Sequence, residues 1–335
     1  MNRNPTVDKK SAHRADRLRS KRRAITVVLT VLAFALAACG TNAAAVQGST
    51  PSALGPGLRM GPVELVTSDL EGLHRFYTEG VGLTTLSSDE DDVILGTEGT
   101  ELFRLIAAGS PDAAPDDYSQ AGLYHSAFLF PDATELASAV LRTATLKPDS
   151  FQGSSDHKVS HAFYFADPEG NGVELYADTP EDTWEWNDGL VTMGSAALDP
   201  NAYIATHLGN RTPNASAKEV STGHVHLRGG DLQQAEEFYE DGLGFAVTAR
   251  SQGAIFLAAN GYHHHLAVNT WSSAGAGKRP DSLGLRTVSI HVADVAELDA
   301  VASRLTAHKI PHELGKGTLT TQDPWGTGIT VRVAG

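Results

Sequence analysis

Apolar and polar positions alternate along this chain in a pattern that repeats after 162 residues. Residues 69–83, DLEGLHRFYTEGVGL, place apolar side chains at helical spacing after an aspartate that can cap a helix, and they end in Gly-x-Gly, where a helix would stop. Residues 231–245, DLQQAEEFYEDGLGF, repeat this pattern without a gap. Runs typical of β-strands precede the two segments, at residues 62–66 and 224–227. The two copies predict the same strand–helix unit twice.

A second pair of segments follows the same offset. Residues 122–132 align with residues 284–294, and each segment leads into a stretch rich in alanine and leucine that predicts a helix. The sequences DPEGNGVEL at 167–175 and DPWGTGITV at 323–331 predict tight turns between strands, because proline fixes φ and glycine allows positive φ. The chain is therefore predicted to be an α+β protein of four units, each a strand, a helix and three strands (βαβββ). These units lie near residues 58–110, 120–178, 220–272 and 283–335.

Some further features call for structural interpretations only. Residues 179–219 are predicted to be a linker between the two halves, in which Trp184 and Trp186 serve as packing anchors. The acidic run SSDEDD at 87–92 mimics a calcium-binding loop, but a solvated hairpin is the simpler interpretation. We expect His161 to be structural.

The first 38 residues predict a targeting segment, which is left out of the fold. A basic stretch at 17–23 precedes an apolar run at 24–38, which is shorter than the ~20 residues that a membrane-spanning helix needs. The run continues into LAACG at 36–40, which resembles a bacterial lipobox, so residues 1–38 are interpreted as a lipoprotein signal peptide. Lipidation of Cys39 would anchor the protein at the outer face of the cytoplasmic membrane. Residues 39–57 are predicted to be a flexible tether.

Alternatives remain open for this segment. A plain secretory signal with a chance cysteine would carry no lipid, and Arg22 and Arg23 hint at twin-arginine export instead of the general secretory route. Cys39 is the only cysteine in the sequence, so no intrachain disulfide can form. Beyond the first 38 residues the chain carries 17 basic and 38 acidic residues, a formal charge of −21. This acidic balance argues against a nucleic-acid partner.

The order of several short motifs across the four units resembles that of a known superfamily. The motifs are GLYH at 122–125, DH at 156–157, ADPEGNGVE at 166–174, GHVH at 223–226 and GYHHHLAVNTW at 261–271. Together they resemble the vicinal oxygen chelate superfamily, which includes glyoxalase I, the bleomycin-resistance proteins and the type I extradiol dioxygenases. More narrowly, the chain is similar to catechol 2,3-dioxygenases of the CatE type. The resemblance implies two glyoxalase-like domains, at 58–178 and 220–335, whose units pair into two barrels.

In that superfamily the first and last strands of two paired units hold the metal ligands. At the first-strand position the four units carry Pro62, His125, His224 and Thr287. At the last-strand position the second unit carries Glu174 and the fourth carries Thr330. Proline and threonine are unsuitable ligands, so the resemblance implies a metal site of His125, Glu174 and His224. Two imidazoles and one carboxylate form the triad typical of non-haem Fe(II), which leaves coordination positions open.

The ligand order departs from that of the usual two-domain extradiol enzymes. Those enzymes use His, His and Glu from their last two units, whereas this chain offers His, Glu and His from its middle two. The expected site therefore requires units 2 and 3 to share one barrel around the metal, while units 1 and 4 pair as a structural barrel. A pairing of unit 1 with 2 and of unit 3 with 4 would split the triad.

The resemblance also implies three residues that handle protons near the metal, for which histidine suits because it titrates near neutral pH. Tyr164 matches the active-site tyrosine, His157 resembles a histidine that contacts substrate oxygen, and His264 resembles an acid–base histidine. The register around His264 is open, and His263 is nearly as good a candidate. His226 is interpreted as a neighbour on the strand of His224 and not as a ligand.

These residues lead to the hypothesis of an Fe(II)-dependent extradiol dioxygenase that opens a catechol-type aromatic diol with O2. Mn²⁺ would serve the same ligands. One alternative is an exported binding or resistance protein without catalysis, since a fold does not determine a function. Another is a metal-dependent lyase of glyoxalase type, which usually needs more carboxylate or glutamine ligands than the sequence offers. The sequence leaves the oligomeric state and the ring substituents of the substrate open.

Overall fold

The computed structural model describes residues 52–110 and 112–334. The predicted signal peptide, Cys39 and most of the predicted tether lie outside these residues, and what the sequence indicates for them stays a prediction. No helix in the part of the chain that the structure describes is long and apolar enough to cross a membrane.

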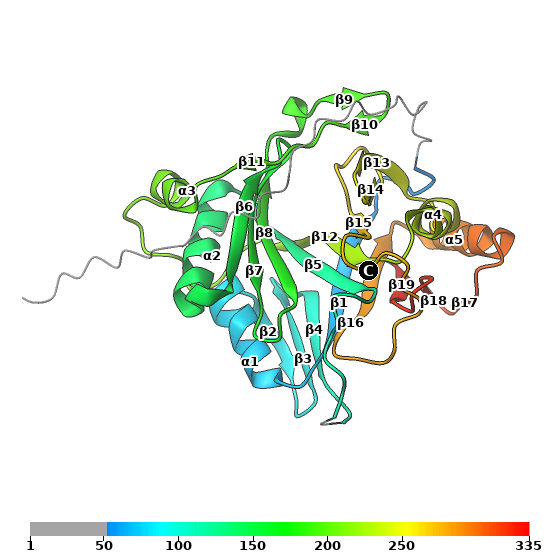
Figure 1. The fold of residues 1–335 in the computed structure, drawn as a ribbon, viewed down its shortest axis with the longest axis horizontal. Helices are drawn as coiled ribbons and strands as arrows, with labels where there is room; N and C mark the ends of the chain where they lie inside the picture. Colours follow the sequence, from blue (N-terminus) through cyan, green and yellow to red (C-terminus); the bar gives the residue numbers. More distant parts are fainter. Residues whose placement is uncertain (1–51, 111, 335) are drawn as a thin grey trace, which may run out of the picture.

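Each of the four predicted units has the expected order of one strand, one helix and three strands (Figure 1). Unit 1 comprises β1 (Arg59–Thr67), α1 (Leu70–Arg75), the π-helical turn η1 (Phe76–Val81), β2 (Thr84–Ser88), β3 (Asp92–Thr97) and β4 (Thr100–Ala107). Unit 2 comprises β5 (Gly122–Leu129), α2 (Ala133–Leu146), η2 (Pro148–Ser150), β6 (Phe151–Asp156), β7 (Ser160–Ala166) and β8 (Gly172–Asp178). Unit 3 comprises β12 (Ser221–Arg228), α4 (Leu232–Glu236), the π-helical turn η4 (Glu237–Gly242), β13 (Ala246–Ser251), β14 (Ala254–Ala258) and β15 (Leu266–Asn269). Unit 4 comprises β16 (Gly284–Val292), α5 (Val295–Ala307), β17 (His312–Leu314), β18 (Thr318–Gln322) and β19 (Gly328–Val333).

The strands of the four units form two mixed sheets. Units 1 and 4 make an eight-stranded sheet in the order β17-β18-β19-β16-β1-β4-β3-β2. Units 2 and 3, with the linker strand β11 (Ala196–Ala197), make a nine-stranded sheet in the order β11-β6-β7-β8-β5-β12-β15-β14-β13. At the centre of each sheet the first strands of two units pair antiparallel, β1 with β16 and β5 with β12, and the last strand of each unit runs parallel beside its first.

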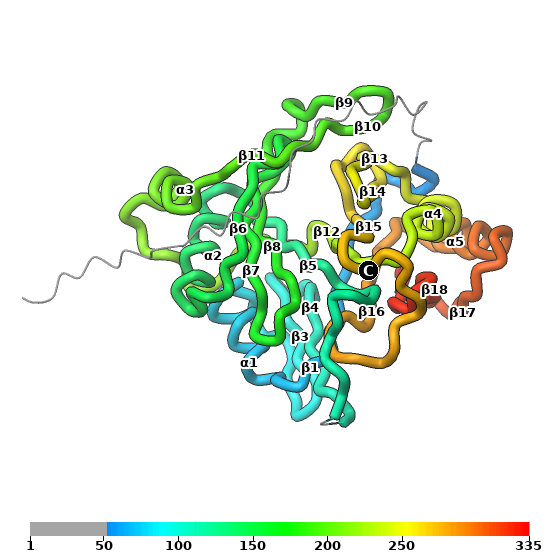
Figure 2. Tube along the Cα trace, in the orientation of Figure 1, coloured from blue at the N-terminus to red at the C-terminus, as the bar shows by residue number. Residues whose placement is uncertain are grey.

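The predicted pairing of units 2 with 3 and 1 with 4 is therefore confirmed for the sheets. Figure 2 shows how β5 and β12, far apart in the sequence, come together at the middle of the molecule. The prediction of two barrels is confirmed only in part. In the nine-stranded sheet the edge strands β11 and β13 do not pair with each other, so the sheet curls as a half-barrel and does not close.

The helices pack their apolar sides on the sheets through one continuous core. In α2 the side chain of Asp132 accepts hydrogen bonds from the N–H groups of Thr134 and Glu135, so it caps the first turn as the sequence predicts. Leu136 and Val140, four positions apart, are then fully buried on one side of this helix. Asp69, Asp231 and Asp294 cap the helices of the other three units in the same way.

Two buried tyrosine–aspartate pairs connect units that are consecutive in the sequence. The Tyr77 hydroxyl of unit 1 donates to Asp167 Oδ2 of unit 2 over 3.1 Å. The Tyr239 hydroxyl of unit 3 donates to Asp323 Oδ2 of unit 4 over the same distance. Each aspartate begins one of the predicted turns and accepts two backbone N–H groups of that turn at Oδ1. Burial raises the pKa of Asp167 to about 6, although these hydrogen bonds oppose the rise.

The structural interpretations of the tryptophans, the acidic run and His161 have mixed outcomes. Trp184 is buried beside Tyr262 and is a packing anchor as expected, but the same expectation is wrong for Trp186, which is 39% exposed. Trp186 belongs to the small hairpin of β9 (Trp186–Asn187) and β10 (Leu190–Val191). The SSDEDD run forms the exposed tip of the β2–β3 hairpin, as predicted. His161 packs its ring on Tyr203 of the linker helix α3 (Pro200–His207).

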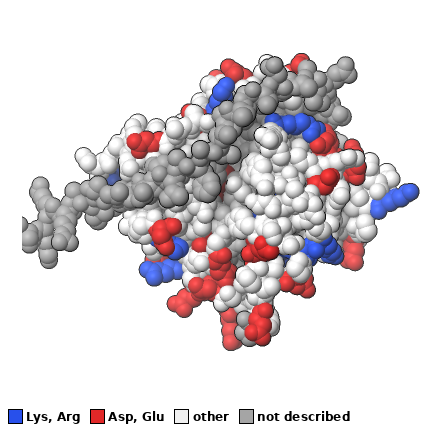
Figure 3. Space-filling model, in the orientation of Figure 1, with Lys and Arg blue, Asp and Glu red and all other residues white. Residues whose placement is uncertain are grey.

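Acidic side chains gather at one end of the molecule. In the view of Figure 3, Asp and Glu side chains cluster at the lower end, where Figure 1 places the turns of the first unit. The chain has a formal net charge of −14. The absence of a nucleic-acid partner, inferred from this acidic balance, stays a prediction.

We expect Tyr239→Phe to lower the free energy of unfolding by ~1–3 kcal/mol, because the buried Asp323 carboxyl loses a hydrogen-bond donor. Tyr77→Phe should cost the same or less, since Asp167 Oδ2 also accepts the side-chain amide of Asn171. Urea unfolding measures both effects. Tyr118→Phe is the control, because its hydroxyl bonds an exposed carbonyl. A cost no larger than that of the control would contradict a stabilising role for the pairs.

Candidate metal centre

The expected ligands lie on three neighbouring strands of the nine-stranded sheet, in the order β8-β5-β12. Glu174 of β8 pairs with Ala127 of β5, and His226 of β12 pairs with His125 of β5. Side chains two positions apart in a strand point to the same face. The side chains of His125, Glu174 and His224 therefore share one face of the sheet, where the curl of the half-barrel brings them together.

The three side chains converge on one point. His125 Nε2 lies 2.9 Å and His224 Nε2 lies 3.1 Å from Glu174 Oε2, and the two Nε2 atoms are 3.3 Å apart. All three residues are buried, with exposures of 6%, 2% and 2% for His125, Glu174 and His224. Among the described residues this is the cluster of histidine, cysteine and acidic side chains whose arrangement can hold a metal ion.

The charges in this cluster favour a bound cation. Burial alone would raise the pKa of Glu174, but the imidazoles of His224 and His125 outweigh it and hold the pKa well below the usual value. Burial lowers the pKa of His224 to about 4, although Glu174 opposes the fall. At neutral pH His224 is thus an uncharged imidazole beside a carboxylate. This is the protonation state that a divalent metal requires of its ligands, and a buried carboxylate is costly without a cation.

Tyr164 and His157 lie together beside the triad. Tyr164 of β7 pairs with Glu174 of β8, and its ring centroid is 5.6 Å from that of His125. His157 Nδ1 lies 2.6 Å from the carbonyl oxygen of Gly194, which can only accept, so this nitrogen carries a proton. The uncharged form of this ring accepts a hydrogen bond from the Tyr164 hydroxyl at Nε2, over 2.7 Å. Burial raises the pKa of Tyr164 well above its usual value, so the hydroxyl keeps its proton.

The register between His263 and His264 is resolved by their neighbours. The ring of His264 lies against the ligand candidate His224, with a centroid distance of 4.1 Å. His263 lies behind it, with its Nδ1 atom 2.7 Å from His264 Nδ1 and its Nε2 atom 2.9 Å from Asp178 Oδ1. Burial, followed by the neighbouring imidazoles of His224 and His263, lowers the pKa of His264 well below its usual value. His264 is therefore an uncharged imidazole next to the triad.

Comparison with known families agrees with this arrangement. The profile of the Glyoxalase/Bleomycin resistance protein/Dioxygenase superfamily matches residues 59–175 and 221–330. The chain belongs to this superfamily. The two matched segments cover the two halves of the repeat, and residues of both halves contribute to the cluster of His125, Glu174 and His224.

Relatives within the superfamily include ring-cleaving enzymes. The chain is 31% identical over 269 residues to the catechol-2,3-dioxygenase of Bacillus subtilis (strain 168), an alignment that covers 79% of this chain and 93% of that enzyme. It is also 31% identical over 126 residues to biphenyl-2,3-diol 1,2-dioxygenase 3 of Rhodococcus globerulus, covering 36% of this chain and 60% of the relative. Among solved structures, a mutant of glyoxalase I from Zea mays has the same fold, with a TM-score of 0.53 at 17% identity over 83% of this chain and 94% of that one.

Several site residues were not predicted from the sequence. Asp178 is one, and it lies on β8 four positions after Glu174, on the same face of the strand. Tyr176 lies between them on this face and bonds the Tyr262 hydroxyl over 2.8 Å. The signal was present in the sequence as Glu, Tyr and Asp at every second position of a strand that is otherwise apolar. Gly223 leaves the room for Tyr176, since a Cβ atom there would lie 1.8 Å from the tyrosine oxygen.

A series of contacting aromatic rings connects the triad to the surface. Tyr124 lies between His226 and Trp271, with centroid distances of 4.8 and 5.3 Å. Phe256 contacts both His226 and His264, at 5.9 and 5.2 Å. Trp271 is 45% exposed, so these rings lead from solvent to the buried centre. His226 Nε2 is hydrogen-bonded to the side-chain amide of Asn269 over 3.0 Å, which leaves it outside the converging triad.

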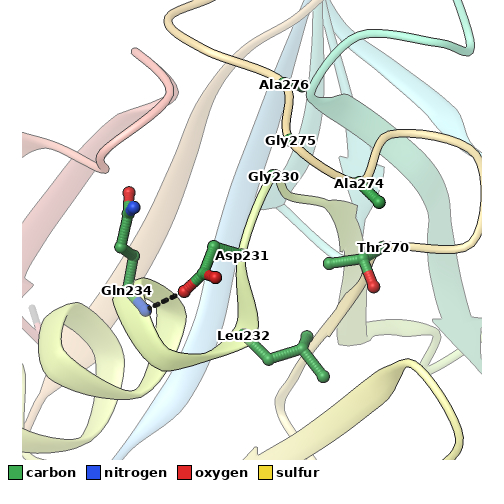
Figure 4. A pocket seen from close by; sticks show the side chains of 8 residues that line it. All are labelled: Gly230, Asp231, Leu232, Gln234, Thr270, Ala274, Gly275 and Ala276. Atoms are coloured by element: carbon green, nitrogen blue, oxygen red, sulfur yellow. Dashed lines mark hydrogen bonds between the residues drawn. The ribbon is translucent and has the colours of Figure 1, made fainter.

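A surface hollow lies away from the converging ligand atoms and does not compete with the triad as a functional site. It lies between the start of α4 and the loop after β15 (Figure 4). Its one ionisable lining residue is Asp231, whose carboxylate already caps α4 through the N–H of Gln234. The rest of the lining is Gly230, Leu232, Gln234, Thr270, Ala274, Gly275 and Ala276.

We expect Glu174→Gln and His224→Ala to weaken binding of a divalent metal by ~10²-fold or more. Loss of a residue that only hydrogen-bonds a metal ligand already lowers metal affinity about 10–100-fold, and loss of a ligand itself should lower it further. Elemental analysis of protein loaded with Mn²⁺ and dialysed measures the bound metal. His226→Asn is the control, since its Nε2 is occupied by Asn269. Full metal retention in Glu174→Gln, or equal loss in His226→Asn, would contradict the assigned ligand set.

Proposed function

We propose that this chain is an Fe(II)-dependent extradiol dioxygenase that opens a catechol-type aromatic ring with O2. The observation that carries the proposal is the buried convergence of His125, Glu174 and His224 on one face of the nine-stranded sheet. The similarity to a catechol-2,3-dioxygenase over 79% of the chain supports the same reaction class.

The protein supplies too few ligands to fill every coordination position of a metal. This suits Fe(II) in a dioxygenase, which needs open positions for substrate. The position in unit 3 that corresponds to Glu174 is Ala267, because Ala267 pairs with His226 as Glu174 pairs with Ala127. Alanine offers no ligand, so the protein supplies three donors and leaves further positions for substrate. Bound to these donors, iron would supply Lewis acidity and an electron path between a diol and O2; Mn²⁺ fits the same donors.

Protein residues near the triad would supply proton transfer, hydrogen bonding and apolar contact to the substrate. A catechol must lose protons to bind as a dianion, and the uncharged imidazole of His264 is placed to accept one. Tyr164 keeps its proton and donates it to His157 Nε2, so its oxygen can accept a hydrogen bond from a substrate hydroxyl. Tyr124, Phe256 and Trp271 provide apolar contact for an aromatic ring and exclude water from the buried centre.

The two rival functions fit this site less well. A binding protein without catalysis does not need a buried carboxylate between two imidazoles, which is costly unless a cation occupies it. A lyase of glyoxalase type usually uses more carboxylate or glutamine ligands, and Ala267 occupies the position where the fourth ligand would lie. The observation at Ala267 therefore favours the dioxygenase.

The anaerobically purified protein should contain iron near one equivalent and give a yellow ring-cleavage product when catechol and air are added. Glu174→Ala should lose both the iron and the activity. His264→Phe should keep the iron and lose about 10²–10⁴-fold in kcat, as expected for a lost acid–base group. His308→Ala, an exposed site remote from the triad, is the matched control.

Other outcomes of this assay lead to different conclusions. Stoichiometric metal without product from any catechol would retain the site and contradict the dioxygenase. Absence of metal in the wild type, with no change in Glu174→Ala, would contradict the metal centre and favour the binding protein.

We also propose that lipid on Cys39 anchors the protein at the outer face of the cytoplasmic membrane. The basic and apolar stretches at 17–38 and the following Cys39-Gly40 support this. Cys39→Ser should move the protein from the membrane fraction to the soluble exported fraction, measured by immunoblotting of fractionated cells. Membrane association that is unchanged in Cys39→Ser would contradict the lipid anchor.

A further inference from the structure

A series of hydrogen bonds runs from His264, beside the candidate metal centre, to residues that have no role in the reaction proposed above. His264 Nδ1 lies 2.7 Å from His263 Nδ1, and His263 Nε2 lies 2.9 Å from Asp178 Oδ1. The other carboxylate oxygen, Oδ2, accepts the hydroxyl of Tyr262 over 3.0 Å, and Tyr262 is bonded to Tyr176 over 2.8 Å. His263 is fully buried, whereas the Asp178 side chain is 20% exposed.

When both imidazoles are uncharged, one assignment of hydrogens satisfies every contact in this line. As a carboxylate, Asp178 can only accept, so His263 Nε2 carries a proton and donates it. Neutral His263 then has a lone pair at Nδ1, which requires His264 Nδ1 to carry the proton between them. Neutral His264 is left with a lone pair at Nε2. Among the described residues no protein group hydrogen-bonds this Nε2 atom.

We infer that Asp178 and His263 are positioning residues that hold His264 in the tautomer with its Nε2 lone pair free for the substrate. The inference rests on the proposed function for the identity of that substrate, a diol whose hydroxyl can donate to Nε2. The tautomer itself follows from the contacts of Asp178, His263 and His264 with both rings uncharged. Without the line, a neutral imidazole would partition between two tautomers, and one of them presents N–H where an acceptor is needed.

The packing around His263 is consistent with a fixed ring orientation. Its ring lies against Tyr262 at 4.1 Å and against Trp184 at 5.1 Å between centroids. Its backbone carbonyl accepts the hydroxyl of Thr248 over 2.6 Å. A ring held on two sides, with a bond at each nitrogen, cannot turn to offer Nε2 to His264 without losing both bonds. This is the arrangement by which an outer partner fixes the tautomer of a functional histidine.

The test uses the full-length chain with ¹⁵N-labelled histidine, free of metal and loaded with Zn²⁺. Long-range ¹H–¹⁵N correlation spectra report which nitrogen of each ring carries the proton. We expect His264 protonated at Nδ1 and His263 protonated at Nε2. His264 protonated at Nε2 in the wild type, or His263 protonated at both nitrogens, would overturn the inference.

Two variants of His263 separate positioning from packing. An asparagine side-chain oxygen can occupy the place of His263 Nδ1, so His263→Asn should keep the His264 tautomer, whereas His263→Leu should mix the two forms. Asp178→Ala should mix the tautomers of both rings. An unchanged His264 spectrum in His263→Leu would contradict the role of His263. The wild-type spectrum decides the assignment even where a variant does not fold.

Catalytic measurements give a second readout. With catechol, His263→Leu and Asp178→Ala should lower kcat about 10–100-fold at unchanged metal content, and His263→Asn should retain most of it. Equal kcat in His263→Leu and wild type would overturn the positioning role even if the tautomer is as assigned. If no catechol is turned over by the wild type, the proposed function fails, while the spectra still decide the tautomer.

Discussion

The antiparallel pairing of β5 with β12 is the contact on which the candidate metal centre depends. His125 comes from the first half of the chain and His224 from the second, and only this pairing brings their Nε2 atoms to 3.3 Å. Glu174 joins them because β8 runs parallel to β5 on the other side. A buried carboxylate at this junction would oppose folding without a cation, so metal binding and correct pairing of the two halves should stabilise each other.

A second set of contacts crosses the first. Strands pair unit 2 with 3 and unit 1 with 4, whereas the Tyr77–Asp167 and Tyr239–Asp323 bonds join unit 1 to 2 and unit 3 to 4. Arg142 adds to the second set by donating to the carbonyl of Val81, and Arg304 donates in the same way to Leu243. Every unit is thus held by two different neighbours. This explains why Phe-Tyr at 76–77 and 238–239 and Asp-Pro at 167–168 and 323–324 repeat, although only one sheet carries the candidate metal ligands.

The repeat made much of this fold predictable from the sequence. At the ligand positions that the resemblance implies, Pro62, Thr287 and Thr330 are unsuitable, and the remaining candidates His125, Glu174 and His224 required the observed pairing of units. Asp178 was not predicted, because its role depends on a contact with His263 of another unit, and no local pattern reveals such a contact. The prediction that Trp186 is a packing anchor was wrong, because a tryptophan in a two-stranded hairpin has no second layer of structure to cover it. Half-barrel curvature depends on how the edge strands end, which strand patterns do not encode.

The two sheets differ in charge at homologous positions, and this accounts for their different roles. In unit 1 the position that corresponds to Glu174 is Arg104, because Arg104 pairs with Glu64 as Glu174 pairs with Ala127. The Arg104 guanidinium is bonded to Asp92, with Nε 2.8 Å from Oδ2, and lies 3.4 Å from Glu64. The eight-stranded sheet thus contains its own cation where the nine-stranded sheet presents an anion. A fixed guanidinium repels a metal ion, whereas the buried carboxylate of Glu174 is an anion that a metal ion could balance.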